Sequence, residues 1–307
     1  MNKVFRIGTR DSQLAVWQAT LVQQQLAANN ISTELVYIKS EGDLDLITPL
    51  YEIGVQGIFT KTLDAALLSK RIDIAVHSMK DVPTQLAAGI AQAAVLERAS
   101  YKDILVFKNN KDFLNDFNSQ AVIATSSIRR QAQWLHRYKN HTIENLRGNV
   151  NTRLRKVAEN NWNGAIFAAA GLERINVRPA NSVDLDWMLP APSQGAIMVV
   201  CREEDNEVKE FCGSLNHEAT ALCTKIEKDF LRALMGGCST PISALAVIEN
   251  DTVYFRGNIF SLDGKQKVEV EKKVNKNNAG ETGFEAAEEL LSNGGRQISE
   301  SIRNAKK

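Results

Sequence analysis

Few cysteines set the first limit on this chain. Only four of its 307 residues are cysteine, namely Cys201, Cys212, Cys223 and Cys238, and no two of them form a CxxC pair. Four cysteines are too few for a disulfide framework in a chain this long, and no histidine-rich tract accompanies them to suggest a zinc site. We therefore expect reduced thiols and a cytoplasmic location.

The sequence also lacks segments that would carry it into or across a membrane. Its first eighteen residues contain neither the apolar core nor the cleavage site of a signal peptide, and no stretch approaches eighteen apolar residues. The P-loop motif GxxxxGKS/T and the metalloprotease motif HExxH are absent too. We expect an unexported protein with no membrane association and no metal.

A net charge near zero excludes a further class. The 37 basic and 36 acidic side chains leave a formal charge of +1, which argues against a general nucleic-acid binder. The distribution is uneven, because six arginines fall within residues 129–155. One region of an otherwise neutral chain is therefore basic.

Strand and helix patterns alternate up to about residue 200 and then change character. Strands are expected at 4–8, 34–38, 72–76, 104–107, 121–124, 165–168 and 196–201, and helices at 59–68, 127–138, 150–159 and after an N-cap on Asp11. A helix at 217–234, strands at 244–248, 253–260 and 266–274 and a last helix at 283–303 follow. These patterns predict an α/β fold with mainly parallel sheets in domains 1–99 and 100–195, a return segment 196–216, and an α+β domain 217–307 with an antiparallel three-stranded sheet.

Polar residues follow the third expected strand, in VHSMKDVPT at 76–84. Open α/β folds bind ligands at the carboxyl ends of their strands, and Lys80 and Asp81 lie there, ahead of a restraining proline. The alternative is a solvated turn with an incidental ion pair, and spacing alone leaves that alternative open.

Arginines lie at a helix start in ATSSIRRQAQ, at 124–133. The serines are candidate N-caps, and backbone N–H groups at a helix start attract anions. Arg129 and Arg130 occupy the first turn, where positive charge opposes the helix dipole unless a nearby anion compensates it. The alternative is a pair of solvent-facing arginines.

A second helix start of this kind occurs in LRGNVNTRLRK, at 146–156. Gly148 marks the turn, Arg147 precedes the helix and Arg153 lies about one turn inside it. Because arginine forks bind carboxylates or phosphates bidentately, two such motifs favour a polyanionic ligand. Arg10 and Ser12 repeat the arrangement at the first strand-to-helix turn.

A cysteine follows two glycines in LMGGCSTPIS, at 234–243. Glycines permit a tight turn and close approach to the backbone, so the Cys238 thiol could be exposed and reactive. Cysteine is also often a small buried hydrophobe, and this alternative stays open.

These segments resemble the porphobilinogen deaminase family. The matching segments, in the family's order and spacing, are GTRDSQLAVWQA, VQGIFTKTLD, DIAVHSMKDVPT, ATSSIRRQAQ, NLRGNVNTRL, AAAGLERI, LPAPSQGA and MGGCSTPI. One such segment would be weak evidence for the family, but eight segments in the same order and spacing are very specific evidence. The last sixty residues match only in general character.

The resemblance implies two lobes like the halves of a type II periplasmic binding protein, with a third domain that carries the cysteine loop. It implies a transferase of tetrapyrrole (haem) biosynthesis that deaminates four porphobilinogen molecules and joins them head to tail into hydroxymethylbilane. Growth occurs on a dipyrromethane cofactor, made from substrate and held by a thioether to Cys238. We expect a monomer with no obligatory protein partner.

The family's functional residues carry over by position. Asp81 matches the catalytic aspartate, whose carboxylate can stabilise the cations formed when ammonia leaves and when rings join. Besides Cys238, the residues matching cofactor contacts are Ser78, Lys80, Thr125, Ser126, Ser127, Arg129, Arg130, Arg147 and Gly148. Those matching substrate contacts are Arg10, Ser12, Phe59, Arg153, Arg174 and Gln194.

The sequence departs from the family's pattern at two positions. Gln56 replaces a lysine of the family's mobile loop, and Ser193 begins SQG where the family has GQG.

Two other functions compete with this one. The first is a non-enzymatic anion-binding protein of the periplasmic type, which would predict an export signal and would leave the cysteine loop unexplained. A transferase of the same fold acting on a phosphorylated substrate would carry no covalent pyrroles.

Overall fold

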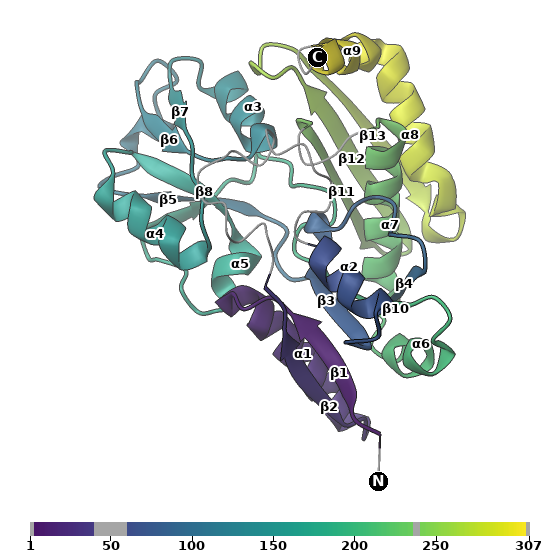
Figure 1. Cartoon of the computed structure of the whole chain (residues 1–307). Helices are drawn as coiled ribbons and strands as arrows, with labels where there is room; N and C mark the ends of the chain where they lie inside the picture. The colour runs from purple at the N-terminus through teal and green to yellow at the C-terminus, as the bar shows by residue number, and fades with distance from the viewer. Residues whose placement is uncertain (1–2, 40–59, 236–239, 305–307) are drawn as a thin grey trace.

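Three β-sheets organise the described part of the chain, which comprises residues 3–39, 60–235 and 240–304 of a computed structural model. Figure 1 shows each sheet with its own helices, the second sheet in teal and the third in green beside the yellow C-terminal helices. The loop expected at residues 40–57 lies outside the described residues.

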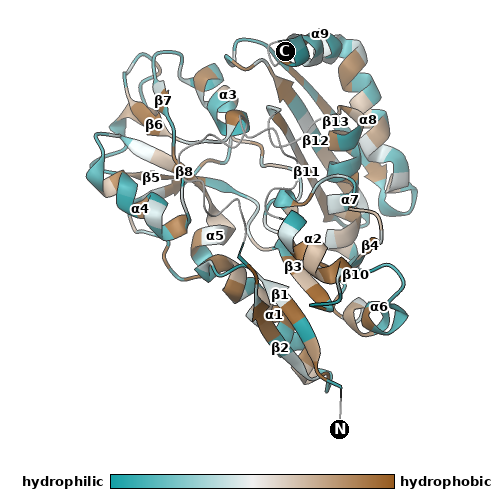
Figure 2. Ribbon diagram, in the orientation of Figure 1, coloured by the Kyte–Doolittle hydropathy of each residue, from teal (hydrophilic) through white to brown (hydrophobic). Residues whose placement is uncertain are grey.

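The first lobe is a five-stranded sheet with the order β2-β1-β3-β10-β4. Its strands are β1 (Phe5–Thr9), β2 (Thr33–Tyr37), β3 (Ile74–Ser78), β4 (Ile90–Val95) and β10 (Ile197–Arg202). Helices α1 (Gln13–Ala28) and α6 (Asn206–Gly213) cover one face and α2 (Lys61–Leu68) the other, so Val76 lies in one core and Ala75 in the other. Because both faces are covered, the central strands β3 and β10 are largely apolar, as the brown colour of β3 in Figure 2 shows.

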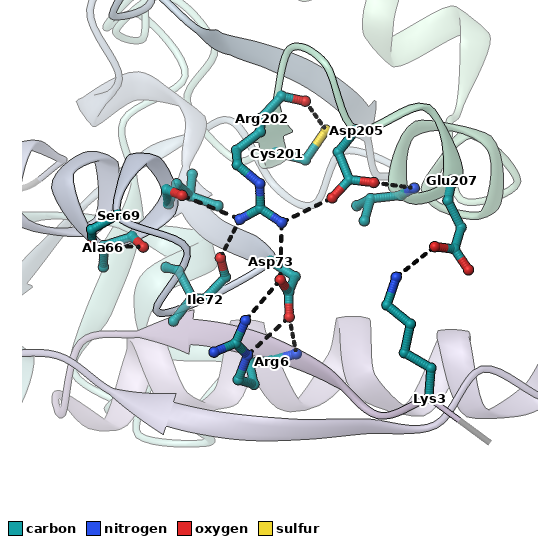
Figure 3. Close-up of polar contacts among 12 residues, drawn as sticks. Lys3, Arg6, Ala66, Ser69, Ile72, Asp73, Cys201, Arg202, Asp205 and Glu207 are labelled. Carbon is teal, nitrogen blue, oxygen red and sulfur yellow. Dashed lines mark hydrogen bonds and ion pairs between the residues drawn. The ribbon is translucent and has the colours of Figure 1, made fainter. Parts of the chain in front are cut away.

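Strand β10 belongs to the first sheet, although it follows all the strands of the second lobe in the sequence. It runs antiparallel to β3 and β4, whereas β1 pairs with β2 and β3 in parallel, so the expected mainly parallel sheet is mixed. Arg202 at its end donates to the carbonyl oxygens of Leu67 and Ile72 and to the carboxylates of Asp73 and Asp205 (Figure 3). Arg6 of β1 donates to Asp73 as well, so one network holds β1, β3 and the return strand together.

The second lobe repeats this arrangement with the order β7-β6-β8-β5-β9. Its strands are β5 (Asp103–Phe107), β6 (Val122–Ala124), β7 (Thr142–Glu144), β8 (Gly164–Ala168) and β9 (Ser182–Asp184), and its helices are α3 (Ile128–Arg137), α4 (Val150–Glu159) and α5 (Ala169–Glu173). Here β5 is the strand antiparallel to its neighbours, β8 and β9. The predicted pair of α/β lobes is confirmed.

The third unit is an antiparallel sheet of β11 (Ile242–Glu249), β12 (Thr252–Phe260) and β13 (Lys267–Asn275), as predicted. Helices α7 (Glu218–Ala233) and α8 (Thr282–Leu290) pack on it. The single last helix expected at 283–303 is wrong. A break at Leu291–Gly295 separates α8 from α9 (Arg296–Asn304), because Asn293 leaves helical geometry and Gly294 has φ +107°.

A buried ion pair ties the third unit to the two segments that connect the lobes. Glu227 of α7 is 0% exposed and accepts hydrogen bonds from the Arg98 guanidinium at 2.6 and 3.1 Å. It also accepts from the backbone N–H groups of Ser193, at 2.6 Å, and Ala246, at 2.8 Å. Arg98 precedes β5 and Ser193 precedes β10, so both lobe connections meet at one carboxylate.

Candidate functional site

The first helix starts close to the carboxyl end of β1, as expected, but its cap is Ser12 rather than Asp11. The Ser12 hydroxyl accepts from the Ala15 N–H at 3.4 Å. A serine oxygen that satisfies a helix N–H explains why the chain turns here, and it leaves Arg10 between β1 and α1.

Strand β3 ends two residues later than expected, so Ser78 is its last residue rather than part of the following turn. The Gln18 side chain of α1 donates to the Ser78 hydroxyl at 2.9 Å. Met79, Lys80 and Asp81 then form a 3-10 turn, anchored by the Met79 side chain, which is 2% exposed.

Lys80 lies among the charges of the second lobe. Burial lowers its pKa to about 8; Asp81 raises the pKa, while the nearby Arg130 and Arg129 lower it. Both side chains are only partly exposed, and an incidental pair on a solvated turn would not feel the charges of the other lobe. The turn therefore presents Lys80 and Asp81 toward the start of α3.

Arg129 and Arg130 are buried, at 5% and 6% exposed, so the solvent-facing alternative is wrong. The anion that compensates them is Asp103, at the start of β5, which accepts from Arg129 at 2.8 Å and from Arg130 at 2.7 Å. Burial alone would raise the pKa of Asp103, but the two guanidiniums outweigh it and lower the pKa to about 2. The sequence left a compensating anion open as one of two alternatives and did not identify Asp103.

The serines before α3 do not cap it as expected. Ser127 occupies the N-cap position without a side-chain cap bond, and its N–H donates to the Thr125 hydroxyl at 3.2 Å. The Ser126 hydroxyl accepts from the Leu146 N–H at 3.1 Å and donates to the Leu146 carbonyl oxygen. Ser126 thereby fixes the segment that leads to Arg147.

The turn into α4 is built as predicted. Gly148 has φ +112°, a conformation that favours glycine, and the Asn149 side chain caps the helix by accepting from the Thr152 N–H at 3.0 Å. The Arg153 Nε donates to the Gly148 carbonyl oxygen at 2.7 Å. This bond folds Arg153 back toward the helix start.

Arg153 joins the same charge cluster. Its pKa is lowered to about 10, first by burial and then by the charges of Arg130 and Arg147, against the opposing effect of Asp81. The charges of Asp81, from the first lobe, and of two arginines of its own lobe therefore act on Arg153. We call Lys80, Asp81, Arg129, Arg130, Arg147 and Arg153, with Asp103, the interlobe charge cluster.

Arg174 and Gln194 lie at the lobe connections. Arg174 follows α5, donates to the Gly195 carbonyl oxygen at 2.7 Å and lies over the Trp17 ring of α1. Its Nε is buried and has no hydrogen-bond partner among the described residues. Gln194 donates to Asp103 at 2.9 Å and to the Tyr101 carbonyl oxygen at 2.8 Å, so it contacts the first lobe connection.

Phe59, Gln56 and Cys238 lie outside the described residues. Ser243, five residues after Cys238 in the sequence, accepts from Gln133 of α3 at 3.1 Å. Gln133 lies one helical turn after Arg129, so the strand that follows the cysteine loop is held beside the interlobe charge cluster.

The other three cysteines are free and buried. Burial raises the pKa of Cys201 and Cys223 to about 11 and that of Cys212 to about 12. Thiols with such pKa values are poor nucleophiles near neutral pH.

One cavity of about 410 Å³ lies away from this cluster, between the Arg98–Tyr101 connection, α7 and β11. None of the described site residues lines it, so charge rather than cavity size defines the candidate site. Within the described ranges there is no grouping of metal-ligating side chains. No helix in that part of the chain has the length and apolar character to cross a bilayer.

Comparisons with known proteins match nearly the whole chain. The family model "Porphobilinogen deaminase, dipyromethane cofactor binding domain" matches residues 5–210, and "Porphobilinogen deaminase, C-terminal domain" matches 221–292. A porphobilinogen deaminase of Desulforamulus reducens is 38% identical over 307 residues, which cover 99% of each chain.

The solved structures to which this chain is similar are more distant in sequence. A periplasmic substrate-binding protein of an ABC transporter from Coxiella burnetii is 14% identical, with a TM-score of 0.43, and the match covers 71% of this chain and 94% of that one. The Bordetella pertussis BvgS periplasmic VFT2 domain is 12% identical, with a TM-score of 0.42, covering 69% and 86%.

Proposed function

This chain belongs to the porphobilinogen deaminase family, and from that premise we propose how its own residues carry out the family's reaction. The enzyme is a transferase of tetrapyrrole biosynthesis that deaminates porphobilinogen and joins four units into hydroxymethylbilane, using a dipyrromethane cofactor. Its substrate is porphobilinogen.

The described residues fit a cofactor that carries carboxylates. The interlobe charge cluster holds five cations, Lys80, Arg129, Arg130, Arg147 and Arg153, against the two carboxylates of Asp81 and Asp103, so it has an excess of positive charge. The buried Nε of Arg174 is a further donor. When bound, the dipyrromethane supplies the pyrrole carbon to which the next unit is joined, and its acid groups are what arginine forks bind bidentately.

We propose that Cys238 holds the cofactor by a thioether. A thiolate is a good nucleophile toward the electrophile formed when porphobilinogen loses ammonia, and a thioether resists water. The raised pKa values of the three buried cysteines leave them unsuited to this role. The bond between Ser243 and Gln133, close in sequence to Cys238 and in space to the arginines, supports the assignment.

Asp81 is the proposed catalytic residue. Its carboxylate stabilises the positive charge that develops on the substrate as ammonia leaves, and its oxygens accept the proton lost when the rings join. The observation that carries the proposal is the meeting of Lys80 and Asp81 from the first lobe with Arg130 and Arg153 from the second.

The remaining contacts are proposed from the family pattern and the positions described above. Residues proposed to hold the cofactor are Ser78, Lys80, Thr125, Ser126, Ser127, Arg129, Arg130, Arg147 and Gly148. Residues proposed to hold the substrate and the growing chain are Arg10, Ser12, Phe59, Arg153, Arg174 and Gln194.

We also propose three domains, at 1–99 with 196–216, at 100–195 and at 217–307, which the membership of the three sheets supports. The enzyme is proposed to act as a cytoplasmic monomer without nucleic acid, membrane or obligatory protein partner. The free thiols of the described cysteines support a reducing compartment, and the interlobe charge cluster is built from one chain.

Replacing Asp81 by asparagine tests the mechanism. Asp81→Asn should retain the covalent pyrroles, because the arginines and Cys238 are intact, yet lose about 10²- to 10⁴-fold in kcat, since the charge and the proton acceptor are gone. Intact mass reports the adduct, and assay of hydroxymethylbilane reports turnover. Asp112→Asn, at an exposed acid of the second lobe, is the matched control and should be as active as the wild type. Near-normal turnover of Asp81→Asn would remove this residue from the mechanism.

A further inference from the structure

Asp103 is a buried carboxylate that the reaction described above does not use. It is the first residue of β5 and is 0% exposed. Its oxygens accept from Arg129 at 2.8 Å, from Arg130 at 2.7 and 3.1 Å, and from Gln194 at 2.9 Å. Three side chains from two different segments therefore converge on one group.

This pairing fixes both guanidiniums at two points. Besides Asp103, Arg129 donates to the Leu189 carbonyl oxygen at 2.7 Å, and Arg130 donates to the Ile166 carbonyl oxygen at 3.0 Å. A planar guanidinium held by a carboxylate on one side and a carbonyl on the other cannot rotate freely. The two arginines are therefore oriented before any ligand arrives.

The charge balance points the same way. Two adjacent buried arginines at a helix start repel each other and oppose the helix dipole. One carboxylate between them removes part of this cost and leaves the pair with a net positive charge. The remaining positive charge can attract a ligand carboxylate, whereas a second internal carboxylate would have cancelled it.

We propose that Asp103 is a positioning residue for the cofactor: it holds Arg129 and Arg130 in the orientation that receives the carboxylates of the dipyrromethane, and through Gln194 it couples them to the segment that precedes β10. The proposal rests on the proposed function, because it takes these arginines as cofactor ligands. Asp103 itself is fully buried and acts through the two arginines.

The test follows uptake of the cofactor by protein produced in a host that makes no porphobilinogen. Purified chain is incubated with porphobilinogen, samples are denatured at intervals, and intact mass gives the fraction that carries two pyrrole units. Asp103→Asn should load at least about tenfold more slowly than the wild type, the lower end of what loss of a group supporting binding side chains costs. Asp103→Glu, which keeps the charge, should recover part of the rate.

Asp184→Asn is the matched control. Asp184 lies in the same sheet and accepts from Lys102 at 3.0 Å and Arg178 at 2.6 Å, but it contacts none of the cofactor arginines. This variant should load at the wild-type rate. Loading of Asp103→Asn at the wild-type rate would overturn the inference, whereas a wild type that never acquires the adduct would overturn the proposed function instead.

A second pair of variants keeps the test decisive if Asp103→Asn does not fold. Arg129→Met is compared with the double variant Asp103→Asn/Arg129→Met, whose net buried charge at this site equals that of the wild type. If Asp103 orients Arg130, the double variant loads several-fold more slowly than Arg129→Met, a difference that a double-mutant comparison isolates. Equal loading rates would show that Asp103 is only a counter-ion and would overturn the inference.

Discussion

His77, the residue before Ser78 in β3, is buried and makes the fold sensitive to acid. It is 6% exposed, and its Nε2 has no hydrogen-bond partner among the described residues. Burial, together with the positive charges of Arg10 and Lys228, lowers its pKa to about 4. The folded protein therefore keeps this imidazole neutral, whereas the unfolded chain protonates it near pH 6.5.

We predict that the free energy of unfolding falls by about 2 kcal/mol between pH 7 and pH 5 through His77 alone. A depressed folded pKa gives stability that is present above pH 6.5 and is lost as pH falls toward 4, because only the unfolded chain gains the proton. Urea denaturation at the two pH values measures the loss. His77→Leu should flatten the dependence, and His136→Leu, which leaves His77 in place, should keep it. An unchanged slope in His77→Leu would contradict the pKa assignment.

Individual site residues were predictable where local motifs mark them, and Asp103 was not. Arg129 and Arg130 stand at a helix start, so a compensating anion was one of the two alternatives that the sequence offered. The identity of that anion depends on how β5 and α3 pack, and no local pattern around Asp103 reveals it. Likewise, the pairing of Gln133 with Ser243 joins residues 110 apart in the sequence.

At the scale of elements, the turn into α4 decides where two arginines lie. Gly148 has φ +112°, and a Cβ added there would lie 2.7 Å from the Thr152 Cγ2 atom. Arg147 precedes this turn, and Arg153 donates to the Gly148 carbonyl oxygen. A change at Gly148 therefore affects both the helix start and the cations around it.

Gly148→Ala should lower the free energy of unfolding by about 1–3 kcal/mol, because alanine is strained at this φ. It should also weaken porphobilinogen turnover, since Arg147 and Arg153 shift with the turn. Chemical denaturation and a steady-state assay give the two values. Gly213→Ala is the control, because a Cβ there meets nothing within 4 Å, and it should leave turnover unchanged and keep or slightly raise the free energy of unfolding. Equal stability of the two variants would show that the turn tolerates a side chain.

Many elements were predicted closely, but β4, α6 and the short strands β7 and β9 were missed. The bounds of α4 are those expected from the sequence, and β10 is displaced by one residue. Strands β7 and β9 have three residues each and exist through pairing with β6 and β5, so no local signal marks them. The C-terminal helix was expected to be continuous, but it is interrupted at Leu291–Gly295.

On the scale of the whole molecule, the site depends on how three units meet. Figure 1 shows α3 of the second lobe facing the third sheet across the centre of the molecule. Gln133 and His136 of α3 contact the third unit through Ser243 and the Gly264 carbonyl oxygen. Glu227 joins that unit to both lobe connections. The helix that carries the arginines is thereby held in place beside the strand that follows Cys238.

The most direct test of the account is the mass of the denatured protein together with its product. We predict that the wild type carries two covalent pyrrole units and makes hydroxymethylbilane from porphobilinogen, and that Cys238→Ala does neither. Cys223→Ala removes a buried thiol of α7, the helix that precedes Cys238 in the sequence, and should keep the added mass of the two pyrrole units. A wild-type chain that forms the tetrapyrrole while its mass matches the bare sequence would contradict the account.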